Sequence, residues 1–223
     1  VVIEPIAGNM GLVPATLEFL QMLRTETQKI GALLIFDEVI SGFRVGLEGA
    51  QGLYEITPDL SCFGKIIGGG FPAAAFGGRQ EIMDRLAPLG SVFQAGTLSG
   101  NPIAMRAGFA TLLEIEKEGF YEKLQAKTDL LVLPIQEGIE RRGLPACLQA
   151  AGSMFTLFFG MNSVAKKEKL DEERFKDFFQ YLFARGVLFP PCAYEVAFIS
   201  SAHTTQHLEK TRDLILEYFD VAF

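Results

Sequence analysis

A lysine and an aspartate of this chain have the chemistry to hold a cofactor that carries an aldehyde. Lys65 ends an apolar run and is soon followed by three glycines at 68–70, and Asp37 ends another apolar run at 31–36. A deprotonated lysine amine forms an imine with an aldehyde, and a carboxylate keeps a pyridinium nitrogen protonated so that the ring accepts electrons. Glycines leave backbone room for a ligand. Together these residues predict a pyridoxal phosphate site.

Each of the two residues also has an ordinary interpretation. Lys65 could be a surface lysine at a strand end, and Asp37 could cap a helix or lie solvated in a loop. The catalytic interpretation requires Lys65 to be partly buried, because burial lowers the pKa of a lysine and frees its amine to react. Neither residue is specific alone.

The predicted elements around these residues alternate in the way that a parallel sheet requires. Short apolar runs predict buried strands, and longer amphipathic stretches predict helices. In the first half these are the strands 1–5, 32–36 and 60–67, the helix 14–30 with Pro14 near its start and Gly31 at its end, and a helix opened by Asn101-Pro102 and closed by Gly119. Ligands of α/β sheets bind at the carboxyl ends of the strands, which is where Asp37 and Lys65 are expected.

The character of the chain changes near residue 120. The remaining pattern predicts helices at 122–142, 171–184 and from about 205, and strands at 153–159, 187–189 and 197–200. In the preceding helix, we expect Met105, Phe109, Leu112 and Leu113 to face a core. We therefore expect an α/β part at 1–120 and a smaller α+β domain at 121–223.

Composition narrows the class of protein. The chain has 223 residues, of which 49% are hydrophobic, and it can bury a sizeable core. No stretch approaches the roughly 18 apolar residues of a membrane helix, and a net charge of −7 argues against a nucleic-acid partner. Three widely spaced cysteines indicate reduced thiols, so we expect a cytoplasmic protein. Because the first residues already form a strand-like run, we expect the chain to be the later part of a longer protein.

Three other groups could bind ligands. The segment 96–102 places small hydroxylated residues before a helix start, which is typical of an anion site and also of an ordinary turn and cap. His203 and His207 have the spacing of a helical metal pair but no H-E-x-x-H arrangement, and Cys192 has no neighbouring base. Neither G-x-G-x-x-G nor G-x-x-x-x-G-K-[ST] occurs. We expect no metal site, no thiol nucleophile and no nucleotide site.

Five segments carry a resemblance to a known family. They are EPIAGNMG at 4–11, LIFDEVISGFR at 34–44, GKIIGGG at 64–70, QAGTLSGNP at 94–102 and YEVAFISSAH at 194–203. In order and approximate spacing they resemble the glutamate-1-semialdehyde 2,1-aminomutases, which belong to the class III, fold type I aminotransferase-like enzymes. The resemblance implies that residues 1–120 are the later part of a large pyridoxal-phosphate-binding domain and that 121–223 are the small C-terminal domain.

The resemblance also implies a role for each matching residue. Lys65 would bond covalently to the cofactor and carry protons, Asp37 would pair with the pyridine nitrogen, and Val39 would pack on a ring face. Thr97 would contact the cofactor phosphate from the neighbouring subunit of a homodimer. Glu195 would meet the amino group of the substrate.

The implied reaction moves an amino group within glutamate 1-semialdehyde to give 5-aminolevulinate, the tetrapyrrole precursor, with pyridoxal or pyridoxamine phosphate as cofactor. Class III enzymes acting on ornithine or 4-aminobutyrate are the rivals, but they commonly carry a Gly-Glu-Gly sequence where this chain has Gly8-Asn9-Met10-Gly11. A non-catalytic module of the same fold would not require both Asp37 and Lys65.

Two features depart from the pattern of the family. Its members extend well upstream of residue 1, so we expect the fragment alone to lack part of the site. Cys192-Ala193 stands where a serine and a polar residue are expected, which leaves open how the substrate pocket near Glu195 is formed.

Overall fold

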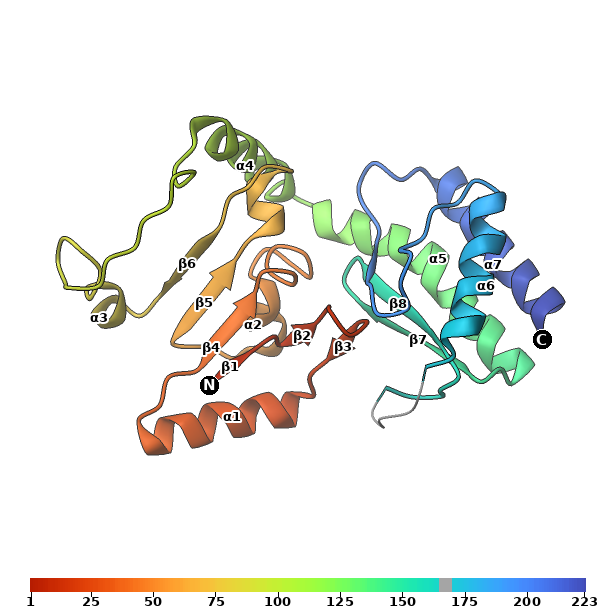
Figure 1. The fold of residues 1–223 in the computed structure, drawn as a ribbon, viewed down its shortest axis with the longest axis horizontal. Helices are drawn as coiled ribbons and strands as arrows, with labels where there is room; N and C mark the ends of the chain where they lie inside the picture. The colour runs from red at the N-terminus through yellow and green to blue at the C-terminus, as the bar shows by residue number, and fades with distance from the viewer. Residues whose placement is uncertain (165–169) are drawn as a thin grey trace. The chain divides into compact units, whose positions relative to one another are not determined.

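The structure, a computed structural model, describes residues 1–164 and 170–223, which divide into two units (Figure 1). The first unit takes in residues 1–6 and 14–120, and the second takes in 7–13 and 121–223. Residues 7–13 therefore group with the later part of the chain, which the expected linear division did not include. Among the described residues, no helix has both the length and the apolar character needed to cross a membrane.

The first unit is built on a four-stranded sheet with the order β1-β4-β5-β6. The first three strands are parallel, and β6 is an antiparallel edge strand. The expected mostly parallel α/β sheet is therefore confirmed. Its strands are β1 (Val2–Ile3), β4 (Ile35–Glu38), β5 (Leu60–Phe63) and β6 (Ala75–Gly78).

Helix α1 (Leu17–Ile30) begins three residues later than predicted. Pro14 lies instead in β3 (Val13–Pro14), which pairs with β2 (Ile6–Ala7). The predicted end is confirmed, since Gly31 adopts a left-handed conformation with φ of 68° that residues with a side chain resist.

The core of the first unit lies where α1 meets the sheet. Leu20 of α1 packs with Leu34 and Phe36 of the β4 region and with Ile56, which follows α2 (Gly49–Tyr54). Three of these side chains are fully buried, and each contributes roughly 1.5–3 kcal/mol through burial.

Strand β5 is shorter than predicted, because the chain turns into a short helix in front of the glycines. Residues Lys65–Gly68 form the 3-10 helix η1, so the expected strand 60–67 is wrong after Phe63. A β-carbon on Gly69 would lie 2.5 Å from the carbonyl oxygen of Ala107, and one on Gly108 would lie 2.1 Å from that of Ile67. These glycines therefore let η1 contact α4 (Pro102–Ile115) at backbone distance.

Because of that contact, the face of α4 that was predicted to be buried is wrong. Met105, Phe109 and Leu113 are about half exposed, whereas Ala104 and Gly108 are buried. Close approach of two backbones requires small residues, so the small side of the helix faces inward.

We expect Gly108→Ala to destabilise the first unit by roughly 1–3 kcal/mol, because a methyl group cannot fit against the Ile67 carbonyl without displacing η1. Gly77→Ala on β6 is the control, since a β-carbon there meets no atom within 4 Å. Hydrogen exchange of amides in the two variants measures the change. Helix propensity alone predicts that Gly108→Ala increases stability, so a stabilised variant would contradict the close contact.

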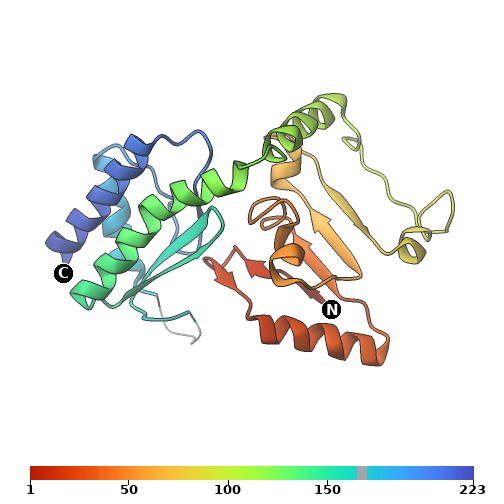
Figure 2. The same ribbon diagram turned by 180° about the vertical axis from the view of Figure 1, so that it is seen from behind.

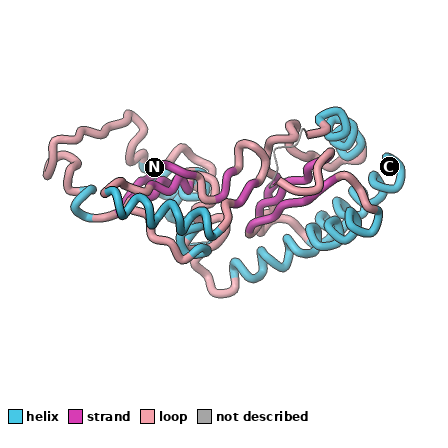
Figure 3. Tube along the Cα trace, turned by 90° about the horizontal axis from the view of Figure 1, so that it is seen from below, coloured by secondary structure: helices cyan, strands magenta, loops and turns pink. Residues whose placement is uncertain are grey.

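A long irregular segment connects α3 (Gln80–Met83) to α4, as the loop colouring of Figure 3 and the trace in Figure 1 both show. It ends at Asn101, whose side-chain oxygen accepts from the amides of Ile103 and Ala104 at 3.1 and 3.2 Å. The predicted N-cap is confirmed. The helix ends at Ile115, four residues before the predicted stop.

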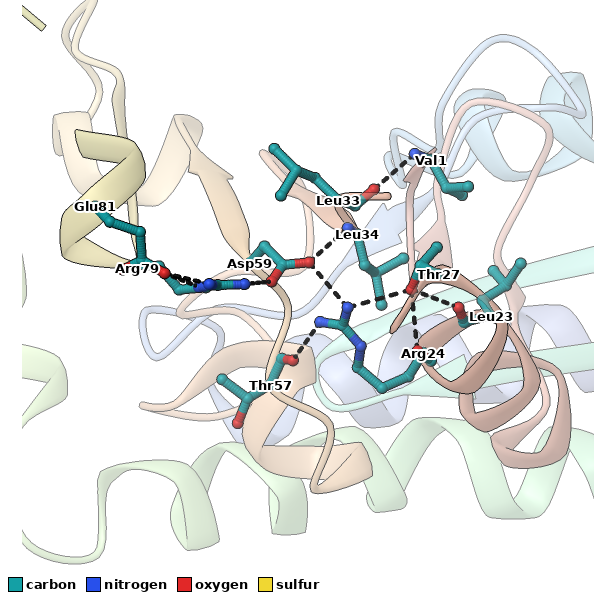
Figure 4. A network of polar contacts seen from close by, with 10 residues as sticks. All are labelled: Val1, Leu23, Arg24, Thr27, Leu33, Leu34, Thr57, Asp59, Arg79 and Glu81. Carbon is teal, nitrogen blue, oxygen red and sulfur yellow. Dashed lines mark hydrogen bonds and ion pairs between the residues drawn. The ribbon is translucent and has the colours of Figure 1, made fainter. Parts of the chain in front are cut away.

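Asp59 links the N-terminal ends of β4 and β5 (Figure 4). One carboxylate oxygen accepts from the Leu34 amide at 2.8 Å and from Arg24 of α1 at 2.9 Å, and the other accepts from Arg79 at 2.9 Å. Burial raises the pKa of this carboxyl, but the Leu34 amide and the two arginines outweigh that effect and lower the pKa to about 2.

In its described residues, the second unit contains a three-stranded antiparallel sheet with the order β7-β8-β9 and three long helices. Helices α5 and α7 pack against each other (Figure 2), and an ion pair joins Arg142 to Asp220. Inside this unit, Phe178 lies 5.3 Å from both Phe159 and Tyr218, measured between ring centroids. The elements are α5 (Phe120–Arg142), β7 (Ala146–Ala151), β8 (Met154–Phe159), α6 (Glu172–Ala184), β9 (Ala197–Phe198) and α7 (Thr205–Ala222).

The three predicted helices and the strand near 153–159 are confirmed in this unit. Strand β7 was not predicted, and the strand predicted at 187–189 is wrong, because those residues form a connection without regular structure. The strand predicted at 197–200 is limited to its first two residues.

Candidate active site

Asp37 is the third residue of β4 and lies beside Cys62 of β5 in the parallel register. Its Oδ1 accepts the Val39 amide at 3.1 Å. Within the described part of the chain, no donor is bonded to Oδ2, so that oxygen can accept a further N–H. The geometry suits an acid that binds a protonated ring nitrogen.

Lys65 follows β5 by two residues, at the carboxyl end of the sheet where a ligand was expected. Its backbone has φ of 46°, in the left-handed region that non-glycine residues rarely adopt. The side chain is exposed and has no ion pair or hydrogen bond within residues 1–164 and 170–223. The expected partial burial of Lys65 is therefore wrong for this chain by itself.

The glycines around Lys65 serve packing more than ligand access. A β-carbon on Gly64 would lie 3.1 Å from a methyl of Val39, so Gly64 lets that side chain lie against the strand end. Gly69 makes room for the backbone of α4. Among the glycines that follow the lysine, Gly70 faces open space, since a β-carbon there would meet no atom within 4 Å.

Glu38 is a buried acid that lies next to Asp37 and that the sequence motifs did not mark as functional. Its carboxylate accepts the Ala50 amide at 2.6 Å, the Gln51 amide at 3.2 Å and the Ser41 hydroxyl at 3.1 Å. These bonds attach the start of α2 and the intervening loop to β4, which fixes the segment that carries Val39. A usable signal was present: side chains alternate along a strand, so Glu38 had to share the buried face of Phe36 and needed donors there.

A pocket of about 1070 Å³ lies on the first unit and brings two predicted residues together. Val39 and Thr97 both line it, as does Cys62. Asp37 and Lys65 are not among its lining residues. Thr97 is exposed in a turn closed by the bond from the Ser99 amide to the Gly96 carbonyl at 2.9 Å.

Cys62 reports on the charge of Asp37. Burial raises the pKa of the Cys62 thiol, and the negative charge of Asp37 raises it further. We expect Asp37→Asn to lower this pKa and to speed alkylation of Cys62 by iodoacetamide at pH 8 about threefold. Peptide mass spectrometry measures the rate, with exposed Cys192 as the internal control. An unchanged Cys62 rate would mean that the two side chains do not interact.

Glu195, the predicted substrate residue, lies exposed in the second unit. Its amide donates to the Cys192 carbonyl at 3.1 Å, and the preceding residue, Tyr194, accepts the Gly11 amide through its carbonyl at 2.7 Å. Residues 7–13 thus support the segment around Glu195. The role of Glu195 stays a prediction.

The two histidines serve local structure. Nδ1 of His203 accepts the Ser200 amide at 3.0 Å, and Nδ1 of His207 accepts the Thr204 amide at 3.3 Å at the start of α7. In the part of the chain that the structure describes, no group of three or more His, Cys, Asp or Glu side chains is placed to hold a metal ion.

The sequence profile of the aminotransferase class-III family matches residues 1–219. The chain belongs to this family. Among curated relatives, the glutamate-1-semialdehyde 2,1-aminomutase of Protochlamydia amoebophila is 58% identical over 100% of this chain and 52% of its own length. That of Nitrosomonas europaea is 50% identical over 95% of this chain and 49% of its own length. The chain spans about half the length of these relatives.

Solved structures of two aminotransferases share the fold. An omega-transaminase from Sphaerobacter thermophilus superposes with a TM-score of 0.89 at 30% identity, over 98% of this chain and 51% of that one. A β-phenylalanine aminotransferase from Variovorax paradoxus gives 0.91 at 27% identity, over 99% and 51%. The fold class expected from the sequence is therefore confirmed.

Proposed function

We propose that this chain provides the lysine and the acid of a pyridoxal-phosphate enzyme that converts glutamate 1-semialdehyde to 5-aminolevulinate. The observation that carries the proposal is 58% identity, over the whole chain, to a glutamate-1-semialdehyde 2,1-aminomutase. The position of Asp37 and Lys65 at the ends of adjacent parallel strands supports it. The proposal includes a cytoplasmic homodimer in which Thr97 serves the site of the partner subunit.

The residues present fit the cofactor. Asp37 has a carboxylate oxygen open to a ring N–H, Lys65 has an amine without a partner in the described chain, and Val39 lies against Gly64, the residue before Lys65. When bound, pyridoxal phosphate supplies an electron sink for the carbon next to the reacting nitrogen. Asp37 would keep the ring nitrogen protonated, and Thr97 would contact the phosphate bound in the site of the partner subunit.

Lys65 would move the proton that the reaction must transfer. Its amine would take a proton from one of the two carbons bonded to the reacting nitrogen as a general base and return it to the other as a general acid. The single residue can do both because its long side chain extends from η1 without another partner in the described chain. Glu195 would bind the amino group of the substrate through a charge-assisted hydrogen bond.

The test is an assay with glutamate 1-semialdehyde and no external amino donor. It is run on the chain alone and on the chain fused behind the upstream half of the Protochlamydia enzyme, which supplies the length that this chain does not span. Formation of 5-aminolevulinate supports the proposal. Transamination of 2-oxoglutarate by ornithine or 4-aminobutyrate, without 5-aminolevulinate formation, would instead support an omega-aminotransferase, the activity named for the Sphaerobacter structure.

A further inference from the structure

A second pocket, of about 810 Å³, lies entirely on residues of the second unit. It is lined by the connection 186–191, the segment 196–199 and the start of α7, together with Phe155, Leu131 and His203. Apart from the polar residues at and just before the start of α7, the lining is apolar. The volume lies in the range of pockets that hold small organic molecules, which are mostly apolar with a few polar groups that orient the ligand.

The charged and donor groups of this pocket all come from α7 and the turn before it. They are His203 in the turn before the helix, and His207, Lys210 and Thr211 of α7, whose three- and four-residue spacing places these three on one helix face. The lining contains one lysine and no acid, although the chain as a whole has 27 acidic and 20 basic residues. The lining of the pocket is therefore positively charged, whereas the chain as a whole has a net negative charge.

The hydrogen bonds of the two imidazoles determine which nitrogen can serve a ligand. Because Nδ1 of His203 and Nδ1 of His207 each accept a backbone amide, the proton of each neutral ring is on Nε2. Each ring can then donate only through Nε2–H. Lys210 makes no ion pair in the described residues, and its Nζ lies 3.6 Å from where a β-carbon of Gly186 would be.

We propose that this pocket binds a small apolar carboxylate. The apolar body of the ligand contacts the walls formed by 186–191 and 196–199. Its carboxylate accepts from the imidazole Nε2–H groups and pairs with the Lys210 ammonium, because charge-assisted bonds are the strongest that these donors can make. This inference does not depend on the proposed function, since every group that it uses is in the second unit.

The chain provides its own reporter, because His203 and His207 are its only histidines. Titration with octanoate is followed by the imidazole 15N and 1H NMR signals. We expect both Nε2 signals to shift and to saturate. Octylamine, with the same apolar chain and the opposite charge, is expected to leave them unshifted. Equal shifts with octylamine, or shifts with octanoate that never saturate, would overturn the proposal.

A pair of lysine variants tests the charge. Lys210→Met keeps the length and apolar stem of the side chain, so we expect it to weaken octanoate binding about tenfold. Lys123→Met on α5, an exposed lysine outside the lining, is expected to leave binding unchanged. Equal affinity of the two variants would show that the pocket does not recognise the carboxylate.

Discussion

Lys65→Ala is expected to abolish the imine absorbance at roughly 400 nm on addition of pyridoxal phosphate, and to lower the rate of 5-aminolevulinate formation at least about 100-fold. The reason is chemical, because alanine can neither bond to the cofactor aldehyde nor carry a proton. Both readouts are measured on the fusion used for the activity assay.

The same substitution is expected to leave stability unchanged, which separates a chemical role from a structural one. The Lys65 side chain is exposed and unpaired within the described residues, and alanine bears the same backbone strain at φ of 46° as lysine does. Lys123→Ala is the matched control for removing an exposed lysine. If Lys65→Ala loses activity only in proportion to a loss of folded protein, Lys65 has no chemical role.

The sequence was sufficient to place Asp37 and Lys65 near strand ends, because the two residues follow apolar runs whose strand nature is a local property; their roles stay predictions. Their adjacency followed from the parallel topology, which alternating strands and helices predict. The exposure of Lys65 could not be predicted from the same pattern. Burial depends on which chain segments cover a site, and local periodicity contains no information about them.

The errors in α4 and β5 have one physical cause. Periodicity assigns large apolar residues to the buried face, as it did for Met105, Phe109 and Leu113. The close contact between η1 and α4 instead requires residues without a side chain, which are Gly69 and Gly108. A glycine in a helix costs stability unless a close contact requires it, so its position was a signal that hydrophobic patterning does not use.

Asp59→Asn is expected to destabilise the first unit by about 3 kcal/mol at pH 7, because it removes the negative partner of a buried carboxylate–arginine contact. The side chain of Asp59 is 5% exposed and that of Arg24 is 16% exposed, so the arginine loses its counter-charge where water cannot replace it. Glu81→Gln is the control. Glu81 also pairs with Arg79, but both side chains are more than half exposed, and such pairs contribute at most about 1 kcal/mol.

The pH dependence gives this expectation a second, independent test. The pKa of Asp59 is about 2 in the folded chain and 3.8 for an ordinary aspartate, so its contribution is complete above about pH 4 and is lost as the pH falls toward 2. The stability difference between the wild-type chain and Asp59→Asn should therefore shrink over that interval. Hydrogen exchange of the Leu34 amide, which donates to Asp59 at 2.8 Å, measures it at the site. A difference that stays constant from pH 4 to pH 2 would mean that the charge of Asp59 does not stabilise the fold.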